Sequence, residues 1–197
     1  MALFYPWETV PLHRRIKDCE LFDALTTGLM EIVNFFETLA GKWFSQRTTH
    51  YLASQESRAG QSNLQIEFLA PDDPAIAQMA VGHSPLCGLR IDQDSRMDGD
   101  TQSVKSSSLM VILSADAAGK GTMLLSQSGQ DARAGEYSLE NEVLTLQTPV
   151  ADGQVEERLW FANPNLRMRT SVVKVGDRVQ LTSFCSEIRM GGGPPKS

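Results

Sequence analysis

Two arginines separated by one residue, Arg167 and Arg169, form the pattern in this sequence best suited to chemistry. They belong to the stretch ERLWFANPNLRMRTS, which begins at Glu157 and alternates like a strand on either side of Asn163-Pro164-Asn165. Residues two apart on a β-strand lie on one face, so the two guanidinium groups form a single cationic feature. Guanidinium groups bind carboxylates strongly, and an anionic ligand is therefore predicted.

The turn residues predict how the strands around this pair are aligned. A three-residue loop at Asn163-Pro164-Asn165 places Phe161 opposite Arg167, and a two-residue turn at Gly176-Asp177 places Arg169 opposite Phe184. One face is then predicted to carry Glu157, Leu159, Phe161, Arg167, Arg169, Ser171, Thr182, Phe184 and Ser186. The opposite face is predicted to carry Trp160, Met168, Val172, Leu181 and Cys185.

The pattern by itself leaves open which of these two faces is inside the protein. Charged side chains are almost never buried without a partner, which favours a solvated arginine face and a core built on the Met, Val and Leu side. Phe161 and Phe184 are large for an outer face, however, and polar groups among aromatic ones also describe a ligand pocket.

The elements that must position these side chains are mostly strands. About ten are predicted, at residues 42–52, 62–70, 88–95, 107–114, 121–127, 133–139, 142–148, 155–162, 166–175 and 178–189. Apolar spacing predicts a short amphipathic helix over residues 30–40, and PDDPAIAQMAVG predicts a second short helix inside a loop. Sequential antiparallel strands in this number usually close to remove their edges, so an all-β up-and-down barrel is expected.

Composition excludes several classes of protein. The chain has 197 residues and a net charge of −6 without a basic run, which argues against a nucleic-acid-binding surface. It contains no apolar run long enough for a membrane span and no signal-peptide pattern, so a cytoplasmic location is predicted. The cysteines, Cys19, Cys87 and Cys185, are odd in number and widely spaced, which indicates free thiols rather than disulfides or a metal site.

Three stretches together resemble one known family. GKWFSQRTTHYL from Gly41, ERLWFANPNLRMRTSVV from Glu157 and LTSFCSEIRM from Leu181 are similar to the S-type phycobiliprotein chromophore lyases. The resemblance runs from about Met30 to Met190. It implies a lipocalin-like barrel that binds an open-chain tetrapyrrole, a bilin such as phycocyanobilin, as a substrate with no separate cofactor. It further implies attachment of the bilin to a cysteine of an apo-phycobiliprotein subunit.

The resemblance also assigns roles to individual residues. Arg167 and Arg169 would bind the bilin propionates, and Glu157 would face the pyrrole N–H groups. Arg47, Trp160, Asn163 and Ser171 are further candidates for binding the bilin, although the predicted register points Trp160 away from the arginines. Trp43 is expected to close one end of the barrel, with Arg189 stacked on it.

One stretch departs from the family pattern and keeps alternatives open. GLRIDQDSRMDGD, from Gly88 to Asp100, lacks the tryptophans that several members place there. A non-catalytic partner in a heteromeric lyase and a fatty-acid or retinoid carrier are therefore retained as alternatives, and a homodimer or a heterodimer with a related subunit is expected. The predicted organisation is an arm at 1–29, the barrel at 30–190 and a flexible tail at 191–197.

Overall fold

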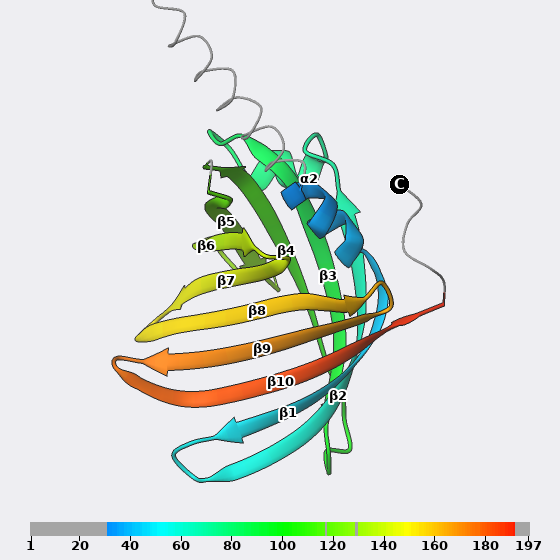
Figure 1. The fold of residues 1–197 in the computed structure, drawn as a ribbon, viewed down its shortest axis with the longest axis vertical. Coiled ribbons are helices and arrows are strands. Elements are labelled where there is room, and N and C mark those ends of the chain that lie inside the picture. The colour runs from blue at the N-terminus through cyan, green and yellow to red at the C-terminus, as the bar shows by residue number, and fades with distance from the viewer. Residues whose placement is uncertain (1–30, 117, 129, 192–197) are drawn as a thin grey trace, which may run out of the picture.

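The computed structural model describes residues 31–116, 118–128 and 130–191 of the chain. These residues form a ten-stranded antiparallel barrel (Figure 1). The expectations for the arm at 1–29 and for the tail beyond Gly191 fall outside the described residues. The strands are β1 (Gly41–Tyr51), β2 (Glu56–Leu69), β3 (Pro85–Met97), β4 (Val104–Ala115), β5 (Lys120–Gln127), β6 (Arg133–Glu140), β7 (Val143–Val150), β8 (Gly153–Asn163), β9 (Leu166–Val175) and β10 (Arg178–Met190).

The topology is a simple meander that closes on itself. Every strand pairs with the next one along the chain, and β1 also pairs with β10, with Trp43 opposite Arg189 and Arg47 opposite Cys185. The predicted up-and-down barrel is confirmed. Several strands are longer than predicted, β2 by six residues at its start, because ESRAGQ at 56–61 carries no apolar alternation that would mark a strand.

A helix over residues 31–39 lies across one end of the barrel, as predicted. Its apolar side chains Ile32, Phe36 and Leu39 are buried in the main core, which they share with Trp43. Phe36 packs edge-on against Tyr137, with the ring centroids 6.2 Å apart. This end of the barrel is therefore filled by side chains, while the hairpin turns at 52–55, 98–103 and 176–177 lie at the other end.

The second predicted helix is α2 (Pro74–Met79), a shorter element than its sequence pattern. The Asp73 side chain caps it by accepting a hydrogen bond from the Ala75 backbone N–H, and Pro74 occupies its first turn. Ile76 of α2 is fully buried in a second apolar cluster with Val111 and Leu113. No helix in the described part of the chain is long and apolar enough to cross a membrane.

Substituting Gly88 should loosen α2. A Cβ atom at this position would lie 2.8 Å from Cδ1 of Ile76 and 3.0 Å from the Met110 carbonyl oxygen. We expect Gly88→Val to lower the free energy of unfolding by about 1–3 kcal/mol, as overpacking generally does. Urea denaturation measures this, and Gly88→Val combined with Ile76→Ala should lose less than the sum of the two single losses, because the two side chains compete for the same space. Equal stability of Gly88→Val and the parent would contradict the packing described here.

The β8–β9 hairpin confirms the predicted register but not the predicted loop. Phe161 lies opposite Arg167, Leu159 opposite Arg169, and Glu157 opposite Ser171. The turn itself contains two residues, Pro164 and Asn165, and a β-bulge between Phe161 and Asn163 supplies the extra residue. A two-residue turn with a bulge has the same effect on the register as the expected three-residue loop.

The predicted register of β10 is wrong by one residue. The turn at Gly176-Asp177 has two residues, as expected, and Arg178 pairs with Val175. A β-bulge between Val179 and Leu181 then shifts the pairing, so Arg169 lies opposite Cys185 rather than Phe184. Because a shift of one residue exchanges the two faces of a strand, Leu181 and Cys185 share the arginine face, and Thr182, Phe184 and Ser186 lie on the other.

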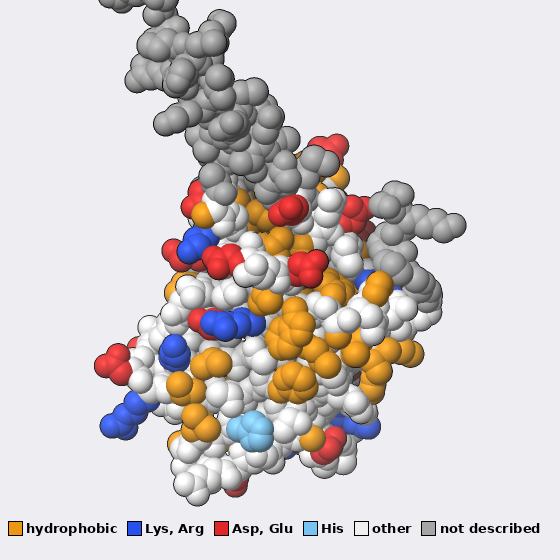
Figure 2. Space-filling model, in the orientation of Figure 1, with side chains coloured by type: hydrophobic (Ala, Val, Ile, Leu, Met, Phe, Trp, Pro, Cys, Tyr) orange, Lys and Arg blue, Asp and Glu red, His pale blue; other side chains and the backbone are white. Residues whose placement is uncertain are grey.

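The outer face of β10 is unusually apolar. Phe184, Ile188 and Met190 are exposed to 44%, 50% and 52%. Figure 2 shows hydrophobic side chains gathered on the surface in this region of the barrel. The inner face of the same strand carries Cys185, Glu187 and Arg189 instead. The polarity of β10 is thus the reverse of what burial of apolar residues predicts.

Candidate functional site

The arginine face is the inside of the barrel. Glu157, Leu159, Arg167 and Arg169 line a cavity of about 260 Å³ together with apolar side chains from most of the other strands. The exposed fraction of the side chain rises from 3% at Arg167 to 26% at Arg169 and 31% at Glu157. The alternative of a solvated arginine face is therefore wrong.

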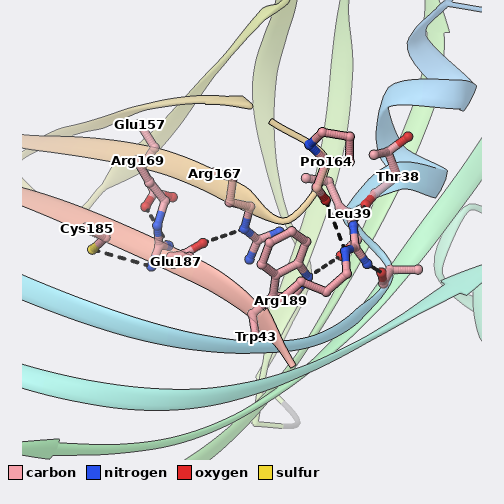
Figure 3. A network of polar contacts seen from close by, with 11 residues as sticks. Thr38, Leu39, Trp43, Glu157, Pro164, Arg167, Arg169, Cys185, Glu187 and Arg189 are labelled. Atoms are coloured by element: carbon pink, nitrogen blue, oxygen red, sulfur yellow. Dashed lines mark hydrogen bonds and ion pairs between the residues drawn. The ribbon is translucent and has the colours of Figure 1, made fainter. Parts of the chain in front are cut away.

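Glu187 is the anion that allows these arginines to be buried. It is fully buried and contacts both of them, through Oε2 to Nε of Arg167 and through Oε1 to Nη2 of Arg169 at 3.2 Å (Figure 3). Arg169 in turn donates from Nη1 to Glu157 over 3.2 Å. The result is a network of four charges from β8, β9 and β10, with its deepest part at Arg167 and its most accessible part at Glu157.

Burial and pairing oppose each other in this network. Burial lowers the pKa of Arg167 to about 10, although Glu187 beside it acts in the other direction. Burial would also raise the pKa of Glu187, but Arg169 and Arg167 outweigh it and hold that pKa below the ordinary glutamate value. For Arg169, burial is likewise outweighed by Glu187 and Glu157, and its pKa is raised. At neutral pH Arg167, Arg169 and Glu187 are therefore ionised.

The deep end of the network rests on Trp43. The guanidinium carbons of Arg167 and Arg189 lie 4.3 and 4.1 Å from the centroid of the Trp43 ring. Arg189 also donates hydrogen bonds to the carbonyl oxygens of Thr38, in the last turn of the 31–39 helix, and of Ala40, which follows it. The structural role predicted for Trp43 and its partner Arg189 is confirmed, and it places Arg167 in a fixed position.

Three guanidinium groups inside the barrel keep a donor without a partner. Nε of Arg47, Nη1 of Arg167 and Nε of Arg169 are buried and make no hydrogen bond within the described residues. Arg47 lies on the inner face of β1, opposite Cys185, and its Nη2 group contacts Met97 Sδ at 3.3 Å. A buried donor left unsatisfied costs about 1–3 kcal/mol, so these groups mark where a ligand with acceptor atoms would be stabilised.

Two of the predicted site residues lie away from the cavity. Trp160 is on the outer face of β8, opposite Met168, as its register predicted. The Asn163 side chain accepts a hydrogen bond from the Asn165 backbone N–H and is exposed, so it shapes the hairpin turn. Ser171 is on the inner face of β9, opposite Glu157, and belongs with the site. The structure therefore places Glu157, Arg167 and Arg169 in the cavity, and Ser171 and Arg47 on the inner faces of β9 and β1 beside it.

Glu187 is the site residue that the sequence reasoning missed. A signal for it was present, because Arg189 was expected inside the barrel on Trp43. Residues two apart on a strand share a face, so an inward Arg189 implies an inward Glu187 and Cys185. That inference conflicts with the bulge-free register, and the structure resolves the conflict in favour of Arg189.

The cysteines in the described residues are free and buried. Cys87 is completely inaccessible, and burial raises the pKa of its thiol to about 12, which disfavours the thiolate. The Cys185 Sγ atom lies 3.9 Å from Nη2 of Arg169. No group of three or more His, Cys, Asp and Glu side chains that could bind a metal ion occurs within residues 31–116, 118–128 and 130–191.

Comparison with known proteins agrees with this geometry. The family model described as CpeS-like protein matches residues 31–190, the whole of the barrel. The chain belongs to the CpeS-like family. The match covers the described part of the barrel-closing helix, α2 and all ten strands of this CpeS-like chain, up to the last residue of β10.

Curated relatives of this CpeS-like chain are named as chromophore lyases. It is 38% identical over 175 residues to the chromophore lyase CpcS/CpeS of Thermosynechococcus vestitus, covering 84% of this chain and 96% of the relative. It is 34% identical over 171 residues to the phycocyanobilin lyase subunit CpcS of a Picosynechococcus strain, covering 81% and 86%. The solved S-type phycobiliprotein lyase CPES of Guillardia theta superimposes with a TM-score of 0.70 at 29% identity, covering 82% of this chain and 93% of that one.

Proposed function

We propose that this protein is a bilin lyase. It binds an open-chain tetrapyrrole such as phycocyanobilin and attaches it through a thioether bond to a cysteine of an apo-phycobiliprotein subunit. The proposal rests on one observation above all, the unpartnered guanidinium donors of Arg47, Arg167 and Arg169 inside an otherwise largely apolar barrel. A bilin carries two propionates, which charge-assisted hydrogen bonds to these donors would hold.

Glu157 and Arg169 are the groups that a bilin would meet first. Both are about one quarter to one third exposed, whereas Arg167 and Glu187 are enclosed. A propionate on Arg169 would compete with Glu157 for the guanidinium group and leave the Glu157 carboxylate free to accept pyrrole N–H groups. Glu187 would keep both arginines charged and in place throughout. Ser171, opposite Glu157, would supply a hydroxyl at the same level.

The reaction itself requires little from the lyase beyond placement. The acceptor's thiolate adds to the ethylidene carbon of the bilin, and a proton is added to the neighbouring ring carbon. This addition involves no net oxidation or reduction of the bilin or the thiol. The barrel would orient the bilin, place that proton and shield the pigment from wrong addition. Glu157 is the carboxyl group best positioned to donate or accept the proton of this reaction, because it is the most exposed member of the network.

The size of the cavity suits a protein that hands its ligand over. A cavity of 260 Å³ is smaller than the roughly 300–1,000 Å³ of pockets that bury drug-sized ligands. A four-ring bilin would therefore be held by its central, propionate-bearing part while one terminal ring extends from the mouth. That terminal ring would be the one the acceptor cysteine attacks.

The alternative of a fatty-acid or retinoid carrier fits the charges less well. A single carboxylate would satisfy one guanidinium group and leave the other free donors and Glu157 without a partner role. A non-catalytic partner in a heteromeric lyase remains the second candidate, because the stretch 88–100 lacks tryptophan. For this protein, a location in the cytoplasm and assembly as a homodimer or heterodimer are predictions that rest on the sequence.

Transfer of pigment tests the proposal directly. Purified protein, phycocyanobilin and each candidate apo-phycobiliprotein subunit are mixed, with and without a related lyase chain, and covalent pigment is scored by zinc-enhanced fluorescence after denaturing electrophoresis. If the protein is a lyase in its own right, it accelerates correct attachment without the related chain. If it is a partner subunit, attachment is accelerated only when the related chain is added. If it is a plain carrier, attachment is accelerated under neither condition.

Replacing the cysteines should leave this transfer intact. We expect the variant Cys19→Ser, Cys87→Ala, Cys185→Ala to transfer pigment at a rate within about threefold of the parent, because the acceptor supplies the nucleophile. The two buried positions take alanine so that no unpaired hydroxyl enters the core. Loss of transfer by a variant with an unchanged circular dichroism spectrum would show that the lyase itself contributes a thiol.

A further inference from the structure

The cavity has a second polar region that the proposed function does not use. The charged residues that line the cavity all come from β8 and β9. Its uncharged polar lining residues, Gln93, Ser108 and Gln127, come from β3, β4 and β5 instead. The remaining lining side chains are apolar. The cavity thus carries charge on one wall and neutral hydrogen-bonding groups on another.

These two walls face each other across the barrel. In the closed order of ten strands, β3 is four neighbours away from β9 and five from β8, and β4 is five away from β9 and four from β8. Strands separated by half the circumference lie on opposite sides of a barrel. A ligand between the walls would therefore present anionic groups to one side and neutral polar groups to the other.

The neutral wall offers both donors and acceptors, and a hydrogen bond holds one of its side chains in place. Nε2 of Gln93 donates to the hydroxyl group of Ser62 over 3.2 Å, and Ser62 is itself buried. This contact orients the Gln93 carboxamide and leaves its carbonyl oxygen to accept a hydrogen bond. Ser108, which is half-buried, lies opposite Gln127, which is exposed at the end of β5, and the two add a hydroxyl and a second carboxamide.

We propose that Gln93, Ser108 and Gln127 form a recognition site for a terminal lactam ring of the bilin. This inference rests on the proposed function and deepens it. A lactam presents one N–H donor beside one C=O acceptor and no charge, which is the complement of a carboxamide and a hydroxyl. A carboxylate finds no cation among these three residues, so the wall discriminates between the two kinds of polar group on the pigment.

The site fixes which end of the pigment leaves the barrel. With the propionates on the arginines and one lactam on the neutral wall, the bilin has two separated attachment points and one orientation. The ring with the ethylidene group must reach an external thiolate, so the lactam held inside is that of the other terminal ring. The neutral wall is therefore a specificity-determining element for that ring.

The test compares two identical substitutions on opposite faces of the sheet. Gln93→Leu removes the inner carboxamide while keeping a side chain of similar size, and Gln65→Leu makes the same change at the exposed position on β2 opposite Asp92. We expect Gln93→Leu to weaken phycocyanobilin binding about three- to tenfold, as loss of a neutral hydrogen bond does, and Gln65→Leu to leave it unchanged. Affinity is measured by absorbance titration.

A spectroscopic measurement separates hydrogen bonding from packing. The lactam C=O stretch in the infrared difference spectrum of the bound pigment should move to higher frequency in Gln127→Leu and Ser108→Ala, because a donor is lost. In Arg169→Ala with Gln93→Leu, the two losses of affinity should multiply, since the residues hold different ends of the ligand.

Each outcome bears on one of the two proposals. Unchanged affinity and an unchanged lactam stretch in these neutral-wall variants would overturn the lactam site while leaving the bilin lyase in place. A double variant no weaker than Arg169→Ala alone would also overturn it. Failure of the parent protein itself to bind phycocyanobilin would overturn the proposed function, and the lactam site with it.

Discussion

Replacing Glu187 by alanine is expected to lower the free energy of unfolding by about 3–5 kcal/mol, because it leaves buried guanidinium charge without a partner. Arg167 has 3% of its side chain exposed, so water cannot take the place of the lost carboxylate. Glu187→Gln should lie between the parent and the alanine variant, since an amide accepts a hydrogen bond but carries no charge. Urea denaturation followed by circular dichroism gives these values.

A glutamate on the outer face provides the control. Glu156 pairs with Arg158 at 3.1 Å on β8, where the side chains are 26% and 58% exposed. Exposed pairs contribute about 0–1 kcal/mol, so Glu156→Ala should change stability little. If Glu187→Ala were no more damaging than Glu156→Ala, the network would not be buried as described.

The pH dependence of folding stability provides a second test of the role of Glu187. Its pKa in the folded protein is held below the ordinary value of 4.5. The ionised side chain therefore stabilises the fold above about pH 4.5, and this contribution is lost as the pH falls through the lower folded pKa. Glu187→Gln should flatten this part of the stability profile. A parent and a variant with the same pH dependence below pH 5 would contradict this.

Replacing Arg169 by alanine is expected to weaken bilin binding about ten- to a hundredfold, the cost of losing one charged partner of a propionate. Arg169 is the arginine of choice for this test, because Arg167 also packs on Trp43 and its loss would affect folding. Arg169→Lys should recover only part of the affinity, since an ammonium group lacks the fixed fork of donors. Binding is read from the absorbance of added phycocyanobilin.

Arg158→Ala is the matched control, because Arg158 lies on the outer face of β8, two residues along from Glu156, with which it pairs. It should bind pigment like the parent. Glu157→Gln adds a separate measurement, since loss of the carboxylate next to the pyrrole N–H groups should shift the absorption band even where affinity survives. Parent-like affinity in Arg169→Ala would remove the main support for the proposed site.

The buried charges are themselves an argument for ligand binding. Buried ion pairs often contribute less to stability than apolar residues of the same size, so stability alone does not explain a network of Glu187 and two arginines. The combined variant Arg167→Met, Arg169→Met, Glu187→Met should therefore be more stable than Glu187→Ala. It should nevertheless fail to bind the bilin.

Much of the fold followed from local patterns in the sequence. Strand number, the closing helix and the register of the β8–β9 hairpin depend on alternation and on turn residues, which are visible in one stretch of chain. The pairing of Glu157 with Ser171 and of Leu159 with Arg169 was predicted correctly. The bulge at Ala162 left the predicted register unchanged, because the extra residue compensated for a turn shorter than predicted.

The bulge at Gln180 was different, because nothing compensated for it. Its position has no strong sequence signal, and the predicted register of β10 followed from the two-residue turn at Gly176-Asp177, which lies before the bulge. Hydrophobic alternation identifies the buried face only where the interior is apolar. In this barrel the interior of β10 is polar, so alternation did not identify Glu187, and its sequence signal was the expected inward position of Arg189 two residues later.

The stacking of Arg167 and Arg189 on Trp43 makes this indole a natural optical sensor. Trp43 touches Arg167, and the free Nη1 donor of Arg167 is where the proposed pigment would bind. Its emission should therefore be quenched by energy transfer when a bilin enters the barrel. The sequence has two further tryptophans, Trp7 and Trp160, and replacing both with phenylalanine would leave Trp43 as its single tryptophan. Loading and release of pigment could then be followed in real time, without any attached label.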